Sequence, residues 1–282
     1  MKVLVTGGKG QFGYDVTQML QGAGHRVFSY GREELDITDQ KQVQYTMEEV
    51  QPDVVIHAAA YTKVDLAETE VNTAYKVNAL GTRNVAVAAE ACRAKLVYIS
   101  TDYVFDGQAA GPYHEFAPTN PQSIYGKSKL AGESFVQQLC SRFFIVRTSW
   151  VYGKYGHNFV KTMLRLAGER DELNVVHDQV GCPTYTVDLA AFVLNLIETE
   201  AYGIYHASNT GSCSWYEFAC AIFEEAEIKI KVNPIPTSEY PLPAPRPANS
   251  VFEHMMIRLQ EMKPLRPWRI ALQEFIQDIR KS

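Results

Sequence analysis

The 282-residue sequence lacks several features that mark other classes of protein. It has only five cysteines, none of them in a C-x-x-C pair, so neither a disulfide framework nor a thiolate metal site is expected. Free thiols of a reducing cytosol are the simpler interpretation. No apolar run approaches the ~20 residues of a membrane helix, and no basic segment leads into an apolar stretch of the secretory type. A cytoplasmic protein without membrane contact is therefore predicted.

The sequence also has no excess of positive charge. Its 27 Lys and Arg against 32 Asp and Glu give a formal net charge of −5, so nucleic acid is not an expected partner. An apolar fraction of 46% is ordinary for a globular protein and is enough for a sizeable core.

Glycines, by contrast, are concentrated directly after the apolar residues 3–5. Gly7, Gly10 and Gly13 stand three apart, and residues 14–21 have the apolar spacing of a helix. A strand, a glycine turn and a helix N-terminus form a cradle for a pyrophosphate, because the backbone can approach the ligand and the helix dipole favours negative charge. The spacing differs from the commonest dinucleotide fingerprint, G-x-G-x-x-G, so a turn that serves packing alone stays an alternative.

Predicted strands and helices alternate through the first two-thirds of the chain. Strands are expected at 25–30, 53–60, 95–100 and 143–149, and helices at 38–50 (capped by Thr38), 71–93 and 123–139. The near-continuous apolar strands indicate a parallel sheet buried on both faces, and hence a doubly wound α/β fold of the Rossmann type. Residues 1–150 are interpreted as a dinucleotide-binding domain to which segments near 185–208 return. Residues 151–282 are interpreted mainly as a smaller substrate-binding lobe, with a polar loop at 178–184, a helix capped by Ser214 and an ordered, proline-rich loop at 234–247.

Ligands in such folds lie beyond the carboxyl ends of the strands, so the residues there are candidates for the site. Arg32 follows the second strand, where no acidic residue is present for a ribose hydroxyl. Arg32 would pair with a 2′-phosphate, which favours NADPH and leaves NADH open; a surface arginine is the alternative. Asp36 and Ile37 would flank the adenine, and alanines after residue 57 would let a cofactor lie against the backbone.

Tyr125 and Lys129 stand four residues apart on one face of a predicted helix. A lysine ammonium beside a phenol is expected to lower its pKa from ~10, so that the phenol exchanges a proton with a carbonyl oxygen more readily. The hydroxyl of Ser100 or Thr101, at the end of the preceding strand, would hold the same oxygen. Such a pair alone is common by chance; after a strand and a glycine cradle it indicates a reductase of carbonyl groups.

These residues together resemble the extended short-chain dehydrogenase/reductases. Within them, five motifs are similar to the dTDP-4-dehydrorhamnose reductase family: STDYVF (100–105), RTSWVY (147–152), NFVKTMLRLA (158–167), DQ-x-G-x-PT (178–184) and RP-x-NS (246–250). The resemblance implies NAD(P)H-dependent reduction of the C4 ketone of dTDP-4-dehydro-β-L-rhamnose, the last step of dTDP-L-rhamnose synthesis for cell-surface polysaccharides.

The resemblance also implies residue roles. Tyr125 would be the proton donor, Lys129 would tune it and bind the nicotinamide ribose, and Thr101 would bind the reacting oxygen. The cofactor is expected to lie against Gly7, Gly10, Gln11, Phe12, Gly13, Arg32, Asp36, Ile37, Ala58, Ala59, Ala60, Tyr61, Thr62, Tyr125 and Lys129. The sugar nucleotide is expected to contact Thr101, Asp102, Tyr125 and Trp150.

Three points stay open at this stage. Some family members hold Mg²⁺ at a homodimer interface through glutamates, but here Asp15 and Val187 (next to Asp188) occupy those positions, which speaks against a metal-bridged dimer while leaving a homodimer possible. An epimerase of the same superfamily would need further acid/base groups, for which Cys182 and His177 are the nearby candidates. A non-catalytic subunit, similar to the regulatory subunit of methionine adenosyltransferase, is the third interpretation.

Overall fold

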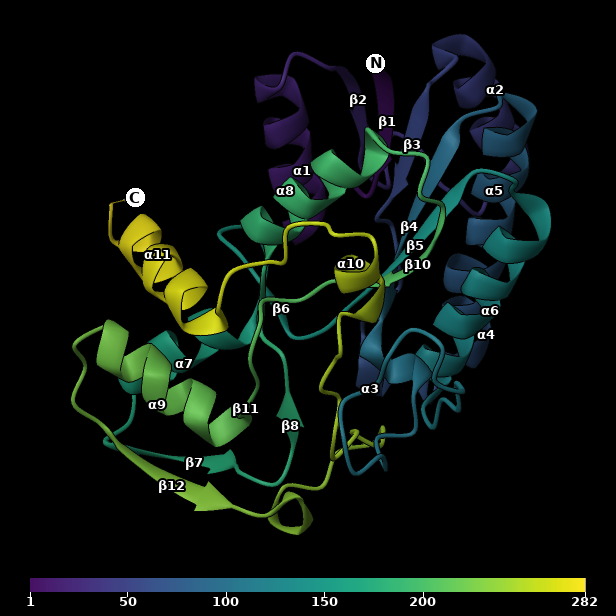
Figure 1. Ribbon diagram of the computed structural model, residues 1–282. Coiled ribbons are helices and arrows are strands. Elements are labelled where there is room, and N and C mark those ends of the chain that lie inside the picture. The colour runs from purple at the N-terminus through teal and green to yellow at the C-terminus, as the bar shows by residue number, and fades with distance from the viewer. Residues whose placement is uncertain (282) are drawn as a thin grey trace.

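The computed structural model describes residues 1–281 (Figure 1). Ser282, the last residue of the predicted 151–282 lobe, lies outside the described residues. The described chain contains a central sheet of six parallel strands. They are β1 (Lys2–Thr6), β2 (Arg26–Tyr30), β3 (Val54–His57), β4 (Lys95–Thr101), β5 (Phe143–Thr148) and β10 (Gly203–His206). The predicted parallel sheet is confirmed.

The order of the strands determines where a ligand can lie. It is β10-β5-β4-β3-β1-β2, so β2 and β3 lie on opposite sides of β1. At such a reversal the connections leave toward opposite faces of the sheet, and a crevice opens beyond the carboxyl ends of the strands. Gly7 follows β1 directly and Ala58 follows β3 directly, so the glycine turn and the alanine run meet at this crevice.

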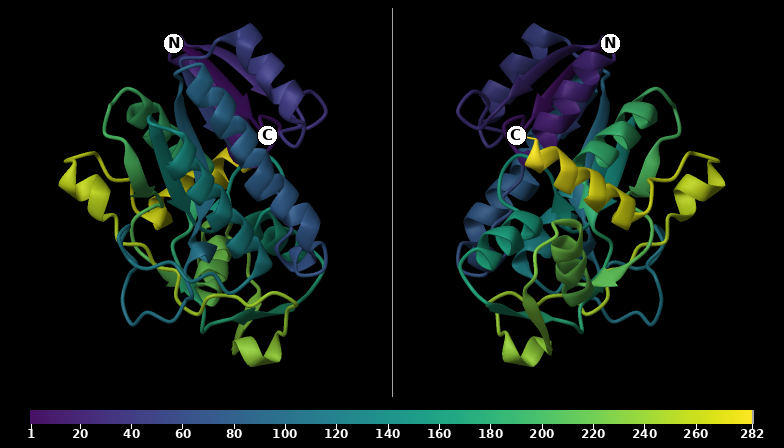
Figure 2. Two further views of the ribbon diagram at one scale, coloured as in Figure 1. Left: turned by 90° about the vertical axis from the view of Figure 1, so that its right-hand side faces the viewer. Right: turned by 90° about the vertical axis from the view of Figure 1, so that its left-hand side faces the viewer.

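Helices cover both faces of the sheet, as the side views in Figure 2 also show. On one face, α1 (Gln11–Gly22) packs against α8 (Thr186–Ile197). The opposite face is covered by α2 (Gln40–Val50), α5 (Thr82–Ala91) and α6 (Ile124–Leu139), whose apolar residues form a second cluster with the strands. This arrangement is the doubly wound fold predicted from the sequence.

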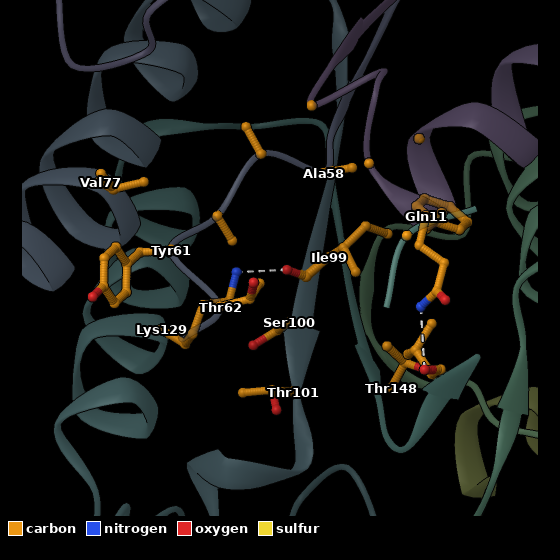
Figure 3. A pocket seen from close by; sticks show the side chains of 18 of the residues that line it. Gln11, Ala58, Tyr61, Thr62, Val77, Ile99, Ser100, Thr101, Lys129 and Thr148 are labelled. Atoms are coloured by element: carbon orange, nitrogen blue, oxygen red, sulfur yellow. Dashed lines mark hydrogen bonds between the residues drawn. The ribbon is translucent and has the colours of Figure 1, made fainter. Parts of the chain in front are cut away.

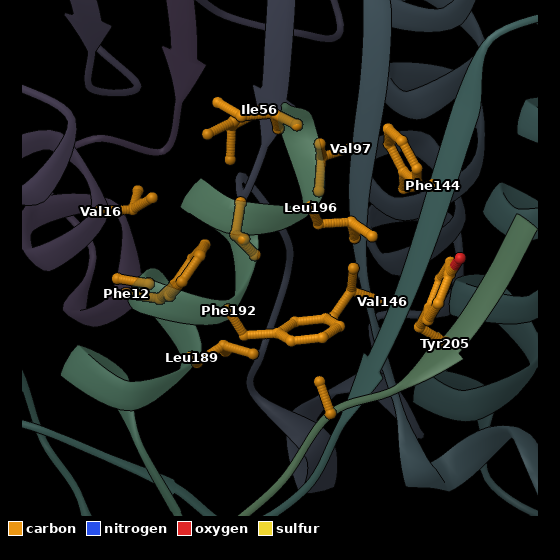
Figure 4. Close-up of a cluster of buried hydrophobic side chains, with 14 of the residues drawn as sticks. Phe12, Val16, Ile56, Val97, Phe144, Val146, Leu189, Phe192, Leu196 and Tyr205 are labelled. Atoms are coloured by element: carbon orange, nitrogen blue, oxygen red, sulfur yellow. The ribbon is translucent and has the colours of Figure 1, made fainter. Parts of the chain in front are cut away.

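The cluster beneath α1 and α8 ties a late part of the chain to the sheet (Figure 4). On α8 the apolar residues recur at spacings of three and four, which gives the helix one apolar face. Phe192 and Leu196 from this face lie in one buried cluster with Phe12 of α1 and Ile56 of β3. Each fully buried side chain of this size stabilises the packing by about 1.5–3 kcal/mol.

The second lobe has a core of its own. It contains α7 (Phe159–Ala167), α9 (Trp215–Glu225) and α11 (Trp268–Arg280), together with the parallel pair β7 (Glu172–Val176) and β12 (Lys231–Ile235). The chain leaves the main sheet after β5, comes back for α8 and β10, and then leaves again (Figure 1). The division into domains at residue 150 stays a prediction.

The predicted cap of α2 is wrong by one residue. Asp39 caps the helix, and its carboxylate accepts hydrogen bonds from the backbone N–H groups of Lys41 and Gln42 at 3.0 and 3.1 Å. Thr38 instead donates its hydroxyl to Asp36 at 2.9 Å. Both residue types cap helices well, so composition alone did not separate them.

Other local predictions differ in detail. The helix expected at 71–93 is interrupted by a π-helical segment, η1 (Lys76–Gly81), and part of the polar loop at 178–184 forms β8 (Val180–Gly181), which pairs with β11 (Cys213–Ser214). The cap at Ser214 is confirmed by a capping box with Glu217. Within residues 1–281, no helix combines the length and the apolar character required to cross a membrane.

Candidate active site

A cavity of about 790 Å³ lies at the carboxyl ends of the central strands, a volume ordinary for a cofactor site. The site residues predicted from the sequence all line it: Gly7, Gly10, Gln11, Phe12, Gly13, Arg32, Asp36, Ile37, Ala58, Ala59, Ala60, Tyr61, Thr62, Thr101, Asp102, Tyr125, Lys129 and Trp150. Figure 3 labels six of them, namely Gln11, Ala58, Tyr61, Thr62, Thr101 and Lys129. The fold thus brings together residues from six separate stretches of sequence. Their individual roles stay predictions.

The glycine turn forms one wall, and this wall consists mainly of backbone. Gly7 has a φ of +70°, and a Cβ there would lie 2.6 Å from the backbone nitrogen of Ala59. At Gly13 a Cβ would lie 2.1 Å from the carbonyl oxygen of Gly7. Gly10 is the N-cap of α1 and offers no side chain to its free N–H groups. Backbone, helix N-terminus and lack of side chains together fit a pyrophosphate.

Polar residues lie where the adenosine end of a dinucleotide is expected. Burial raises the pKa of Asp36, but hydrogen bonds from Thr38 and the charge of Arg32 outweigh this effect and leave the pKa lowered. Arg32 itself is exposed. Lys9 also lines the cavity and forms an ion pair with Glu34 at 2.7 Å. The sequence did not predict either Lys9 or this ion pair as part of the site.

An unpredicted asparagine fixes the segment after β3. Asn78, from the π-helical segment η1, accepts a hydrogen bond from the backbone N–H of Tyr61 at 2.7 Å and donates to the carbonyl oxygen of Tyr61 at 3.1 Å. It also donates to Ser128 of α6 at 3.0 Å. The sequence offers no signal for this contact, because Asn78 lies inside an alanine-rich helical pattern and π-helical segments are rare.

Helix α6 and strand β4 supply the predicted reacting groups. Tyr125 and Lys129 both face the cavity from α6, and Thr101 ends β4 opposite them. The Lys129 ammonium donates to the carbonyl oxygen of Ile99 at 2.7 Å (Figure 3) and lies 4.0 Å from the ring centroid of Tyr98. These contacts hold a buried amine at the end of the strand.

The expected effect of Lys129 on Tyr125 is not found. Burial raises the pKa of Tyr125 to about 12, with a hydrogen bond to Thr101 acting in the opposite direction and the charge of Asp102 adding to the rise. Burial also lowers the pKa of Lys129 to about 7. The cost of burying a charged phenolate dominates, and the Lys129 ammonium does not offset it. Tyr125 is therefore protonated at neutral pH, as a proton donor must be.

A buried carboxyl group adjoins the threonine. Thr101 donates its hydroxyl to Asp102 at 3.0 Å, and the second carboxylate oxygen of Asp102 is buried without a hydrogen bond. Burial raises the pKa of Asp102 to about 6, although the hydrogen bond from Thr101 acts in the opposite direction. A buried polar atom without a partner is unusual, and it makes Asp102, which lines the cavity, a candidate for contact with a ligand.

Behind the reacting groups lies an ion pair that sequence reasoning missed. Glu133, one helical turn after Lys129, is fully buried and accepts two hydrogen bonds from Arg147 of β5, at 2.9 and 2.7 Å. Ser100 donates to the same carboxylate at 2.5 Å. The pair anchors α6 to the sheet at the level of the reacting groups. A glutamate that continues the spacing 125–129–133, and an arginine in an apolar strand, were the available signals.

Trp150 closes the far end of the cavity. Its φ of +48° lies in the left-handed region, which a tryptophan rarely adopts. Its ring stacks on Trp215 with 3.5 Å between centroids and 6° between planes. Trp150 lines the cavity and also packs against the core of the second lobe, so both the substrate role and the alternative of a core aromatic stay predictions.

Comparison with protein-family models assigns the chain to a family. The model described as "RmlD substrate binding domain" matches residues 1–281. The chain belongs to this family. The resemblance found in the sequence motifs is thereby confirmed, and it covers both lobes and the whole cavity between them.

Individual relatives of this RmlD-family chain agree. It is 46% identical to the spore coat polysaccharide biosynthesis protein SpsK of Bacillus subtilis, covering 98% of this chain and 97% of that protein. It is 43% identical to the dTDP-4-dehydrorhamnose reductase of Aggregatibacter actinomycetemcomitans, covering 96% and 97%. The crystal structure of dTDP-4-dehydrorhamnose reductase from Bacillus anthracis in complex with NADP superimposes with a TM-score of 0.97, at 50% identity, and covers 98% and 99%.

The two residues considered as acid/base groups of an epimerase lie outside the cavity. Cys182 is buried and accepts a hydrogen bond from the backbone of Phe252, and His177 is exposed; neither lines the cavity. The extra acid/base groups that epimerisation needs are therefore not supplied by these two residues.

The positions compared with the family's Mg²⁺ site are engaged within the chain. Asp15 accepts a hydrogen bond from Thr186, and burial raises its pKa. Asp188 binds Asn209 and Arg266. Among the described residues, no group of three or more His, Cys, Asp or Glu is placed to hold a metal ion. Dependence on Mg²⁺ and the oligomeric state both stay open.

Proposed function

We propose that the chain is a dTDP-4-dehydrorhamnose reductase, which reduces the C4 ketone of dTDP-4-dehydro-β-L-rhamnose to give dTDP-L-rhamnose. One observation carries the proposal: the phenol of Tyr125, the amine of Lys129 and the hydroxyl of Thr101 line the same cavity as the glycine cradle. Relatives that bear this enzyme name, at 43 and 50% identity over nearly the whole chain, support the same reaction.

The chain's own residues account for the proton. When bound, NADPH supplies the hydride. Tyr125 holds the proton that the ketone oxygen receives, and its raised pKa keeps this proton in place until the oxygen becomes basic. Lys129 lies one turn after Tyr125 on α6 and faces the same cavity. Thr101, at the end of β4, binds the ketone oxygen. The wall behind them is fixed by the ion pair between Glu133 and Arg147, so the donor is oriented before the substrate arrives.

NADPH is the cofactor that the cavity favours. The glycine cradle fits a dinucleotide, and Arg32 and Lys9 place positive charge where a 2′-phosphate would lie. The relative from Bacillus anthracis was crystallised with NADP. NADH is the alternative, because Lys9 is already paired with Glu34 and Arg32 is exposed.

The sugar nucleotide is assigned to the other end of the cavity. Asp102 offers an unpartnered carboxylate oxygen for a sugar hydroxyl, and Trp150 offers an aromatic surface. A small-molecule substrate in a cavity between two lobes requires neither nucleic acid nor a membrane. A role in supplying rhamnose for cell-surface polysaccharides, a cytoplasmic location and a homodimer stay predictions from the sequence.

The decisive experiment follows absorbance at 340 nm with NADPH and dTDP-4-dehydrorhamnose. The proposal expects loss of absorbance that depends on both substrates, with dTDP-L-rhamnose as the product. A non-catalytic subunit would bind NADPH without oxidising it. An epimerase would change the sugar without net consumption of NADPH, so either result would replace the proposal.

A further inference from the structure

The side chain of Gln11 points out of the glycine cradle and toward the second lobe. Its amide nitrogen donates to the backbone oxygen of Val151 at 3.2 Å (Figure 3), and its amide oxygen accepts from the side chain of Asn158 at 2.7 Å. Both polar ends of Gln11 are therefore occupied by the segment between β5 and α7. The resemblance assigned Gln11 to the cofactor pyrophosphate, but only its backbone is free for that contact.

The neighbours of Asn158 determine how these amides are oriented. The Asn158 oxygen accepts from the backbone N–H of Lys161 at 3.0 Å as the N-cap of α7, and its nitrogen donates to the carbonyl oxygen of Gly153 at 2.8 Å. An N–H group can only donate and a carbonyl oxygen can only accept, so each amide has a single consistent orientation. Gln11 thus joins the start of α1 to the start of α7.

The segment that Gln11 holds also carries Trp150. A left-handed conformation at a residue other than glycine costs about 1–3 kcal/mol and persists only where neighbouring contacts impose it. Three contacts do so here: the ring stack on Trp215, a hydrogen bond from the N–H of Thr184 to the carbonyl oxygen of Trp150 at 3.2 Å, and the bond from Gln11 to the next carbonyl. Of these three contacts, only the hydrogen bond from Gln11 is made by a residue of the glycine cradle.

The start of α1 makes two more contacts, one with the second lobe and one with the first residue of α8. The rings of Tyr14 and Tyr155 lie 3.6 Å apart between centroids, and Asp15 accepts a hydrogen bond from Thr186. Gly156, which lines the cavity, lies against Gln11, since a Cβ there would be 3.7 Å from the Gln11 Cβ. The first turn of α1 is therefore part of both halves of the site.

We propose that Gln11 is a positioning residue for the sugar-nucleotide half of the cavity. It holds residues 150–158 against the cofactor cradle and keeps Trp150 in its left-handed conformation. The inference rests on the proposed function for the identity of the sugar nucleotide, and on the hydrogen bonds alone for the contact itself. Loss of the bond weakens sugar-nucleotide binding and leaves dinucleotide binding intact.

The test breaks the contact from both sides, with Q11M and N158S. Methionine keeps the length of glutamine without its hydrogen bonds, and serine still caps α7 but is too short to reach Gln11. We expect KM for the sugar nucleotide to rise about 3- to 10-fold in each variant, the worth of one or two neutral hydrogen bonds. The Kd of NADPH should stay within about twofold. In the double variant KM should rise by less than the product of the two single effects, because both changes remove the bond between Gln11 and Asn158.

A matched control is T162A, which removes another side-chain hydrogen bond at this helix end, from Thr162 to the carbonyl oxygen of Asn158. It should lower thermal stability slightly and leave KM unchanged. Wild-type KM in both test variants, or an equal rise in the Kd of NADPH, would overturn the proposal. If the wild type does not oxidise NADPH, the proposed function fails, and calorimetric binding of dTDP to the same variants still decides the role of Gln11.

Discussion

The two walls of the cavity are built in opposite ways. The cradle after β1 and β3 works by what is missing, since Gly7, Gly13 and Ala58 leave backbone exposed where larger residues would fill the space. The wall formed by α6 and β4 works by what is present, namely a buried amine, a buried carboxyl group and a phenol. Adding atoms to the first wall should therefore weaken cofactor binding. Removing single atoms or charges from the second wall should lower the reaction rate.

Removal of one oxygen from the second wall should have the largest effect. In the proposed reaction Tyr125→Phe takes away the proton that the ketone oxygen receives, so we expect kcat to fall about 10²- to 10⁴-fold. NADPH binding should persist, because the cradle is unchanged. Single-turnover absorbance at 340 nm and fluorescence titration of NADPH measure the two quantities. Turnover at the wild-type rate would remove Tyr125 from the mechanism.

Addition of one methyl group to the first wall should have the next largest effect. Gly7→Ala forces a left-handed φ on alanine and places its Cβ against the backbone of Ala59, so we expect NADPH affinity to fall at least tenfold and stability by about 1–3 kcal/mol. Gly22→Ala, at the far end of α1 with no atom within 4 Å of the new Cβ, is the matched control. It should bind NADPH as the wild type does. If the two variants behave alike, recognition does not depend on the empty space at Gly7.

The buried amine predicts a pH dependence of stability. Burial lowers the pKa of Lys129 to about 7, from 10.5 for an exposed lysine. Between these two values the unfolded chain binds more protons, so this group's contribution to stability rises with pH, by at most about 2–4 °C in Tm per pH unit. The Tm of Lys129→Met minus that of the wild type should therefore fall from pH 7 to pH 9.5. The variant also loses the hydrogen bond to Ile99, which changes its Tm by the same amount at both pH values.

A difference in Tm that stays constant over this range would mean that Lys129 is charged when buried. His57, which is also buried, does not interfere: its pKa is lowered to about 3 from 6.5, so its effect on stability lies below pH 6.5. Differences between variant and wild type also remove the contribution of the tyrosines and cysteines with raised pKa values.

The smallest effect should come from Arg32, an exposed residue at the edge of the first wall. Arg32→Ala should weaken NADPH by about tenfold, or about 1.4 kcal/mol, and NADH much less. Ratios of kcat/KM for the two cofactors give this preference. Equal losses would assign Arg32 to the solvent-exposed surface, and the preference for NADPH would then have to come from Lys9.

The first wall could be predicted from the sequence more fully than the second. Gly7, Gly10 and Gly13 follow a strand within a few residues, so local spacing was sufficient. Tyr125 and Lys129 were found because they share one helix face. Glu133 and Arg147 were missed because their contact joins a helix to a strand, and a charged residue in a sequence is ordinarily taken as exposed.

The contact between Gln11 and Asn158 spans 147 residues of sequence, and a single sequence contains no signal for such a distant hydrogen bond. The cap of α2 was misplaced for the opposite reason: Thr38 and Asp39 are adjacent and both suited to the position, so only the backbone conformation separates them. Burial, finally, decided the pKa of Tyr125, and the spacing of two residues contains no measure of burial.

The position of β10 in the sheet has a consequence for synthesis. This strand ends at His206, whereas β2, at the other edge, ends at Tyr30. A ribosome that adds about 5–20 residues per second needs roughly 10–35 s to pass from one to the other. For most of that interval α1 lacks α8 above it, and from residue 148 onward β5 has one side unpaired, so this is the period in which chaperones would have most to protect.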